Sequence, residues 1–174
     1  MRRRLILLLL TIVSCGLAYA QEGYPMPKVK HLLFYIQHNR GHNTFLYQLH
    51  MNADGRVIRE APIKVTRQLF DEGGEIKPLT DLQRRFAYGV KINAGRGGDY
   101  IFTIAAYPKL KFLLKMKDST HGAVYTHIHR KRMEVKRLFL VQREGTSGLG
   151  TKLDYILFYG MDIQGENVVE KLIP

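Results

Sequence analysis

The chain has 174 residues, a net charge of +12 at pH 7 and one cysteine. This length suits a single domain with a real hydrophobic core, and the lone cysteine excludes a disulfide within the chain. A basic surface attracts anions, so anionic lipid or polysaccharide is a candidate partner. The plainer interpretation is that the charge only keeps the protein in solution.

The first 20 residues are typical of an export signal. Three arginines at positions 2–4 precede the apolar run Leu5–Val13, and residues 18–20 read Ala-Tyr-Ala, a small-x-small cleavage site. The apolar run is too short to span a bilayer comfortably. We therefore predict a cleaved signal peptide over residues 1–20 and export to the periplasm or the cell exterior, with an uncleaved anchor as the alternative.

Cys15 raises a second alternative, because Ile12-Val13-Ser14-Cys15 resembles the lipobox at which bacterial lipoproteins are cleaved and lipidated. Cleavage after Ala20 would instead remove this cysteine. We favour release without a lipid, and an exported lipoprotein anchored at Cys15 stays the alternative. No later segment has the length and apolarity of a transmembrane helix.

Residues 21–30 contain a glycine and two prolines and have no periodicity, so they are predicted to be an extended leader into one β-rich domain over residues 31–174. His31–Gln37 and Thr44–His50 alternate apolar and other residues and are predicted strands. His38–Asn43 between them has turn chemistry.

Two shorter strands are predicted at Arg56–Glu60 and Ile63–Arg67. Pro62 separates them, and it indicates a sheet edge or a bulge because proline cannot donate a hydrogen bond to the ladder. Turn residues follow at Asp71–Gly74.

The hydrophobic period changes at Pro78–Ile92. Leu79, Leu82 and Phe86 have helical spacing, which predicts one short α-helix near residues 79–87. We expect these three side chains to be buried against the sheet, because a short helix is marginal without packing.

Neighbouring residues predict how this helix begins and ends. Thr80 and Gln83 fit a capping box, and Gly89 follows closely enough to end the helix. We expect Arg84 and Arg85 to stay solvated, and Tyr88 to pack at the junction with the next strand with its hydroxyl hydrogen-bonded.

The rest of the chain reads as further short strands. One of them, Lys109–Lys117, alternates most regularly, with apolar residues on one face and lysines on the other. Leu153–Ile163 is apolar on both faces over most of its length and should be a central strand. The other predicted strands are Tyr88–Asn93, Tyr100–Tyr107, Ala123–Arg130, Glu134–Gln142 and Val168–Ile173, the last at an edge.

These elements predict a mainly β fold. Without a long helical crossover, parallel pairing is hard to build. Short strands at regular spacing indicate an antiparallel meander that forms a barrel or a sandwich, with the one helix covering an end or an open edge.

Six short stretches carry a resemblance to known proteins: Phe34-Tyr35-Ile36-Gln37, Asn43-Thr44, Pro62-Ile63-Lys64-Val65, Pro78-Leu79-Thr80, Gln83-Arg84 and Ala87-Tyr88-Gly89. They resemble a family of exported bacterial proteins known only as a domain of unknown function (the DUF4833 type). The resemblance implies export, a single domain and no established activity, ligand or catalytic residue.

Tyr125, His127 and His129 would share one face of a strand. Two imidazoles so spaced can bind a metal such as Zn²⁺. The adjacent cations Arg130 and Arg132 disfavour a metal, and a solvated strand face explains the pattern as well. No cofactor is therefore predicted, and a divalent metal at His127 and His129, in a metal-assisted hydrolase, is an alternative.

Basic residues form a second candidate site. Lys111, Lys115, Arg130 and Arg132 could line up beside Tyr125 and the two histidines and bind phosphate or carboxylate groups. The alternative is a solvated face whose lysines guard against edge pairing. Nucleic acid is disfavoured, because no recognition motif accompanies the charge and export removes the partner.

No catalytic motif points to an enzyme. Ser119 and Ser147 are the serines left after cleavage, and neither lies in Gly-x-Ser-x-Gly. The function predicted first is a ligand-binding or envelope-associated module. The alternatives are the hydrolase above and a structural protein that binds anionic envelope lipid or polysaccharide through its basic face.

Overall fold

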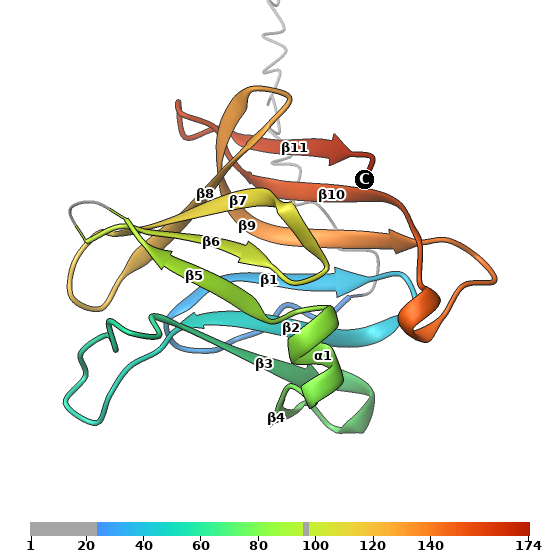
Figure 1. The fold of residues 1–174 in the computed structure, drawn as a ribbon, viewed down its shortest axis with the longest axis horizontal. Helices are drawn as coiled ribbons and strands as arrows, with labels where there is room; N and C mark the ends of the chain where they lie inside the picture. Colours follow the sequence, from blue (N-terminus) through green and yellow to red (C-terminus); the bar gives the residue numbers. More distant parts are fainter. Residues whose placement is uncertain (1–23, 96–97) are drawn as a thin grey trace, which may run out of the picture.

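The computed structural model describes residues 24–95 and 98–174, so the predicted export signal and Cys15 lie outside the described residues. This part of the chain is mainly β-strand, with one α-helix, α1 (Asp81–Phe86), and two short 3-10 helices, η1 (Phe70–Glu72) and η2 (Gly148–Gly150) (Figure 1). The strands are β1 (Leu32–His38), β2 (Gly41–Leu49), β3 (Ile63–Leu69), β4 (Glu75–Pro78), β5 (Val90–Ala94), β6 (Tyr100–Ile104), β7 (Tyr107–Met116), β8 (Gly122–Ile128), β9 (Lys131–Gln142), β10 (Leu153–Met161) and β11 (Asn167–Leu172).

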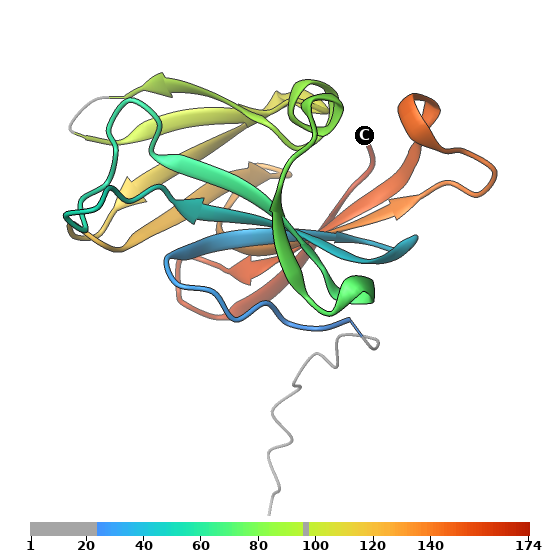
Figure 2. The ribbon, with the colours of Figure 1, turned by 90° about the horizontal axis from the view of Figure 1, so that it is seen from below.

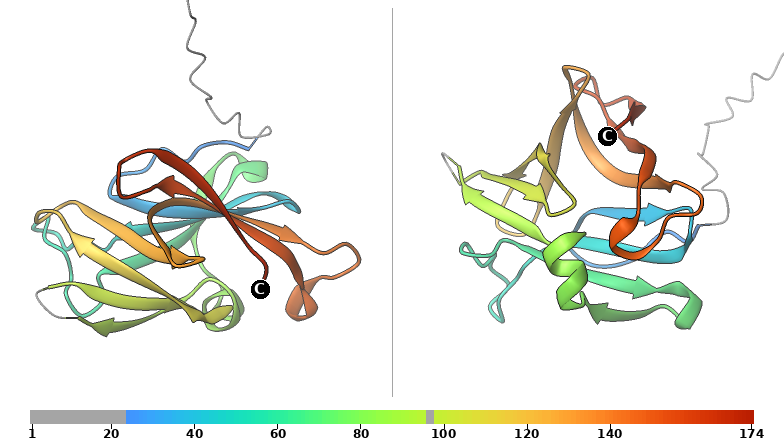
Figure 3. Two further views of the ribbon diagram at one scale, coloured as in Figure 1. Left: turned by 90° about the horizontal axis from the view of Figure 1, so that it is seen from above. Right: turned by 45° about the vertical axis from the view of Figure 1, so that its right-hand side comes forward.

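All eleven strands belong to one sheet, in the order β4-β3-β2-β1-β9-β8-β7-β6-β5, with β10 paired to β9 and β11 paired to β10. The sheet curls into an open half-barrel, and its β5–β7 part faces its β1–β3 part (Figures 2 and 3). The predicted mainly β fold with one short helix is confirmed, and it is a curled single sheet.

The pairing of β1 with β9 is parallel, which contradicts the expectation that every pair would be antiparallel. Tyr35–His38 pair in register with Arg137–Leu140. A parallel connection needs only enough chain to return to the same end of the sheet. Here β2 to β8 supply that chain in place of a crossover helix.

The curl of the sheet centres on β9, which has 12 residues and three neighbours. Residues 131–134 pair with β8 and residues 137–140 pair with β1, while β10 pairs along residues 134–142. β8 and β1 thus pair with successive parts of the same edge of β9. The sheet divides at this point into two parts, which face each other across its concave side.

Aromatic side chains fill the core under this curl. Phe34 stacks on Tyr47 with 4.3 Å between ring centroids, and Phe102 stacks on Phe112 with 5.2 Å. The Phe34 and Phe112 rings are 5.9 Å apart, so β1, β2, β6 and β7 meet through one layer of rings. Such rings supply large apolar burial and fixed geometry.

The described part of the predicted leader, residues 24–30, follows the outer face of β1 as an extended segment. The Gln37 amide donates to the carbonyl of Pro25 and to the Thr44 hydroxyl, both at 2.9 Å. The Tyr24 ring packs edge-on against Phe139, with 5.0 Å between centroids. This cover explains why β1 is buried on both faces.

Other strand predictions have mixed outcomes. β10 lies between β9 and β11 as predicted for a central strand, and β11 is an edge strand. The strand predicted at Arg56–Glu60 is wrong, because only an isolated bridge between Met51 and Val57 forms there. β4 was not predicted, since its four residues carry little alternation.

The beginning of α1 is as predicted. The Thr80 hydroxyl accepts from the Gln83 N–H and the Gln83 side chain accepts from the Thr80 N–H, which completes the capping box. The helix ends with Ala87 as its C-cap. Gly89 then passes so close to the Arg84 carbonyl group that a side chain would collide with it.

The predicted burial of this helix is wrong for two of three residues. Leu79 is 5% exposed, but Leu82 is 56% and Phe86 51% exposed. The helix has only six residues and lies at the rim of the half-barrel, so only its N-terminal flank reaches the core. Arg84 and Arg85 are exposed as expected. No helix among the described residues is long and apolar enough to cross a membrane.

Candidate functional site

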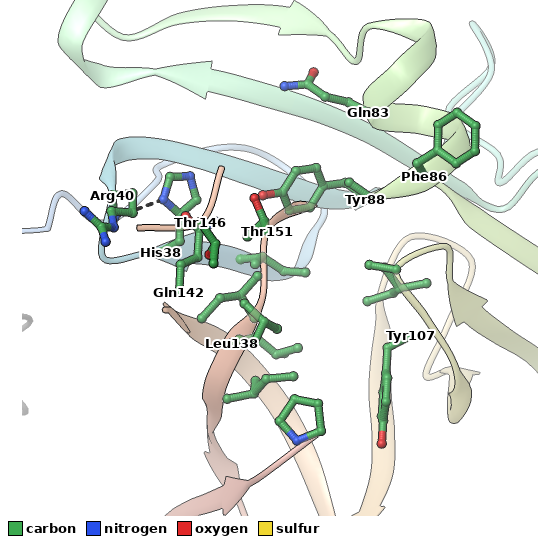
Figure 4. Close-up of a pocket in the computed structure, with 18 of the residues that line it drawn as sticks. His38, Arg40, Gln83, Phe86, Tyr88, Tyr107, Leu138, Gln142, Thr146 and Thr151 are labelled. Atoms are coloured by element: carbon green, nitrogen blue, oxygen red, sulfur yellow. Dashed lines mark hydrogen bonds between the residues drawn. The ribbon is translucent and has the colours of Figure 1, made fainter. Parts of the chain in front are cut away.

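The concave face of the half-barrel contains a cavity of about 1380 Å³ that opens to solvent (Figure 4). Its walls come from β1, the α1 region, the β6–β7 hairpin, β9, β10 and the turn around η2. Most of these side chains are apolar. The cavity therefore lies where the curled sheet fails to close into a barrel.

The strand registers build the floor of the cavity from cross-strand pairs. Leu138 and Leu140 of β9 lie opposite Phe158 and Ile156 of β10. On the other edge of β9, the parallel pairing sets His38 of β1 beside Leu140. Paired residues on neighbouring strands point to the same face, so an imidazole joins an apolar floor.

The rim of the cavity is formed by segments that are far apart in the chain. Leu82 and Phe86 come from α1, Leu149 comes from η2, and Pro174 ends the chain. Figure 2 shows α1, the C-terminus and the η2 turn projecting to the same side of the sheet. Exposed apolar side chains thus surround the opening.

Polar side chains gather at one side of the cavity. Figure 4 places Arg40, His38, Gln142 and Thr146 together, away from Phe86. No carboxylate of the described residues lies within ion-pair distance of Arg40. This side of the cavity can therefore offer a cation and hydrogen-bonding groups to a ligand.

A hydrogen bond to the His38 ring defines which of its nitrogens carries the proton. Its Nδ1 accepts from the Arg40 backbone N–H at 3.2 Å, which leaves Nε2 to carry the proton of the neutral ring. Burial lowers the pKa of His38 below its usual 6.5. The imidazole is therefore neutral at pH 7 and has one N–H available as a donor.

Tyr88 joins α1 to β5 and is held by two contacts. Its ring stacks on Phe45 with 3.4 Å between centroids, and its carbonyl accepts from the Tyr47 hydroxyl at 2.7 Å. Burial raises the pKa of the Tyr88 phenol to about 12. The ring packs as predicted, but the hydrogen bond expected for the hydroxyl is not found among the described residues. The phenol lines the cavity and stays protonated at neutral pH.

Tyr125, His127 and His129 lie away from this cavity. Tyr125 is half-buried on the face of β8 opposite the core residue Val124, and His127 is exposed beside Arg132 of β9. His129 does not continue the strand as expected, because it lies in the β8–β9 turn with a φ of 50°. Its Nε2 contacts the Lys171 carbonyl at 3.0 Å.

The predicted basic residues lie on the same outer face, on β7, β9 and the β8–β9 turn. The Arg132 guanidinium lies 4.4 Å from the Tyr125 ring centroid, and the Lys115 Nζ lies 3.9 Å from Oδ2 of Asp99. Lys111 is exposed on β7, and Arg130 is exposed in the turn.

Glu134 interrupts this basic face. Its nearly buried carboxylate pairs with Lys136 and with Lys117, which lies 3.7 Å away, and accepts from the Tyr125 hydroxyl at 3.4 Å. Anion binding on this face stays a prediction.

No group of three or more histidine, cysteine, aspartate or glutamate side chains among the described residues could hold a metal ion. His127 lies on β8 and His129 in the turn after it, so the two are not a pair on one strand face. Metal binding at these two residues has not been tested and stays a prediction.

The cavity residues were missed because their roles depend on distant segments. His38 was assigned to a turn, and Leu138, Leu140, Ile156 and Phe158 read as ordinary strand residues. One local signal was present: Leu82 and Phe86 stand four residues apart on a helix too short to bury both.

Comparisons with known proteins give one match. Searches of curated proteins and of solved structures find nothing similar to this chain. The sequence model of a family described as "Domain of unknown function (DUF4833)" matches residues 34–171, from β1 to β11. That range holds nearly the whole sheet and most of the cavity wall, and the chain belongs to the DUF4833 family.

Proposed function

We propose that this protein is an exported binding protein that holds an amphipathic molecule in the cavity of its half-barrel. The observation that carries the proposal is the cavity itself, about 1380 Å³ with an apolar floor and polar groups at one side. Open ends of β-barrels commonly hold small ligands, and this open cavity is larger than the pockets of about 300–1,000 Å³ that such ligands usually occupy. Export is supported by the signal-like residues 1–20.

The lining indicates the chemistry of the ligand. Leu138, Leu140 and Phe158 offer contact to an apolar body but no hydrogen bonds. Arg40 and the N–H of His38 could bind an anionic head, either a carboxylate or a phosphate. A molecule with a long apolar body and one anionic group fits both features.

Displacement of a fluorescent probe tests this proposal. Anilinonaphthalene sulfonate should brighten when added to the protein, and long-chain carboxylates and phosphate esters should displace it. The alcohol of the same chain length should displace it less well, because it lacks the charge that Arg40 binds. Failure of the probe to bind, or of all three compounds to displace it, would refute the proposal.

Variants locate the binding within the fold. Leu140→Trp fills the floor and should weaken probe binding about tenfold or more. Leu157→Trp is the matched control, since Leu157 is a half-buried leucine on the neighbouring strand that does not line the cavity. Arg40→Gln should weaken binding of the long-chain carboxylate about fivefold and leave binding of the alcohol unchanged. Equal effects of the two tryptophan variants would place the probe elsewhere.

A further inference from the structure

We infer that the rim of the cavity docks on the surface of an anionic lipid bilayer. The docking surface, called the apolar rim below, consists of Leu82 and Phe86 of α1, Leu149 of η2 and Ile173 beside the C-terminus. These side chains are 56%, 51%, 78% and 72% exposed. They are four of the nine large hydrophobic residues that the described part of the chain exposes.

The elements that carry the four residues lie on one side of the molecule. Figure 2 shows α1, η2 and the C-terminus on the same side of the sheet, while the leader follows the opposite face. Leu82, Phe86 and Leu149 border the cavity, and Ile173 precedes Pro174, which also borders it. The apolar rim is thus a set of separate apolar points around an opening.

Charge near the apolar rim matches anionic headgroups. Arg84 and Arg85 are exposed on α1, and no carboxylate of the described residues lies within ion-pair distance of either. The Arg85 guanidinium lies 5.2 Å from the Phe86 ring centroid. Each cation near an anionic membrane surface favours binding. This helix therefore presents an apolar anchor together with cations that can pair with the anionic headgroups.

The nearby acidic residues do not neutralise the positive charge of these two arginines. Asp81 lies in the first turn of α1, where the helix dipole favours a negative charge. Near η2, Asp154 is paired with Arg143 at 2.8 Å, and Glu144 lies in the same turn. The two arginines of α1 therefore keep their charge available to headgroups.

A bilayer suits the shape of the apolar rim better than a rigid partner does. Lipids can rearrange around separate points of contact, whereas a stable protein interface needs a continuous surface of about 800 Å² per partner. Docking would turn the cavity opening toward the acyl chains. An apolar ligand of the kind proposed above could then pass between membrane and cavity without crossing water, a step that rests on the proposed function.

Tryptophan reporters test the docking directly, because the chain contains no tryptophan. Phe86→Trp and Leu149→Trp each give one indole on the apolar rim. Ile163→Trp is the matched control, since Ile163 is 76% exposed in the turn at the other end of β10. The protein should be exported by its own N-terminal segment, with the start of the purified chain checked by mass spectrometry.

Vesicles of equal parts phosphatidylcholine and phosphatidylglycerol should shift the emission of both rim variants to shorter wavelength. Vesicles of phosphatidylcholine alone should shift it less, and added salt should weaken the effect. The Ile163→Trp emission should not change. An equal shift in all three variants, or no shift in any, would overturn the docking. A shift without vesicles that grows with protein concentration would show that a second copy covers the rim, and would also overturn it.

A charge variant separates docking from ligand binding. The double variant Arg84→Gln/Arg85→Gln should bind the anionic vesicles about fivefold more weakly for each arginine removed. Its binding of anilinonaphthalene sulfonate should match that of the unchanged protein, because neither arginine lines the cavity. Unchanged vesicle binding by this variant would contradict the role of charge. Vesicle binding without any probe binding would refute the proposed function but leave the docking in place.

Discussion

Replacing Gly89 with alanine should destabilise the protein through a collision at the end of α1. A Cβ at this position would lie 2.8 Å from the carbonyl carbon of Arg84 and closer still to its oxygen. The helix end and the chain at Gly89 would have to separate by about 1 Å to restore ordinary contact.

Hydrogen bonds resist this separation on both sides. Tyr88 N–H donates to the Gln83 carbonyl at 2.8 Å, and the Gly89 carbonyl accepts from Ala105 N–H at 2.9 Å. Overpacking costs about 1–3 kcal/mol, and each hydrogen bond that is lost adds about 1 kcal/mol. We expect a loss of about 3 kcal/mol, which lowers the melting temperature of a domain of this size by about 6–12 °C.

Gly150→Ala is the control for this measurement. A Cβ on Gly150 meets nothing within 4 Å, so its effect should stay within about 0.5 kcal/mol. Thermal melts followed by circular dichroism compare the two variants. Equal melting temperatures for Gly89→Ala and Gly150→Ala would show that α1 moves freely, and that it is not a fixed wall of the cavity.

Three further predictions concern the core, the cavity and β10. Phe102→Ala should cost about 3–5 kcal/mol, whereas Phe86→Ala should cost about 1 kcal/mol or less, and urea unfolding that ranks them the other way would contradict the burial. Burial lowers the pKa of His38 below 6.5, so the stability held by its neutral form is present above pH 6.5 and lost as the pH falls. The urea midpoint should therefore fall less in His38→Gln than in the unchanged protein between about pH 8 and about pH 5, and equal falls would refute this. Gly160→Ala should cost about 3 kcal/mol or more, because its Cβ would lie 2.9 Å from the Glu134 carbonyl carbon, and a melt like that of Gly150→Ala would argue against this close approach.

Local patterns in the sequence were sufficient for features that depend on near neighbours. The capping box of Thr80 and Gln83 forms as the spacing predicts, because its two hydrogen bonds lie within one helical turn. Most strands likewise follow from alternation between turns, which places one face inward whatever the partner strand is. The mainly β fold was predictable for the same reason. The family was identified differently, from the resemblance of several short sequence stretches to its members.

The cavity depends on pairings that no local pattern specifies. The parallel register of β1 and β9 sets His38 beside Leu140, about a hundred residues later in the chain. The burial of α1 was also mispredicted, since helical spacing shows that Leu82 and Phe86 share a stripe but not whether a partner covers it. The curl of the sheet decides whether the stripe is covered. β8 and β1 pair with successive parts of the same edge of β9 and diverge from there, so the half-barrel stays open. Leu82 and Phe86 therefore lie exposed at the rim of the opening.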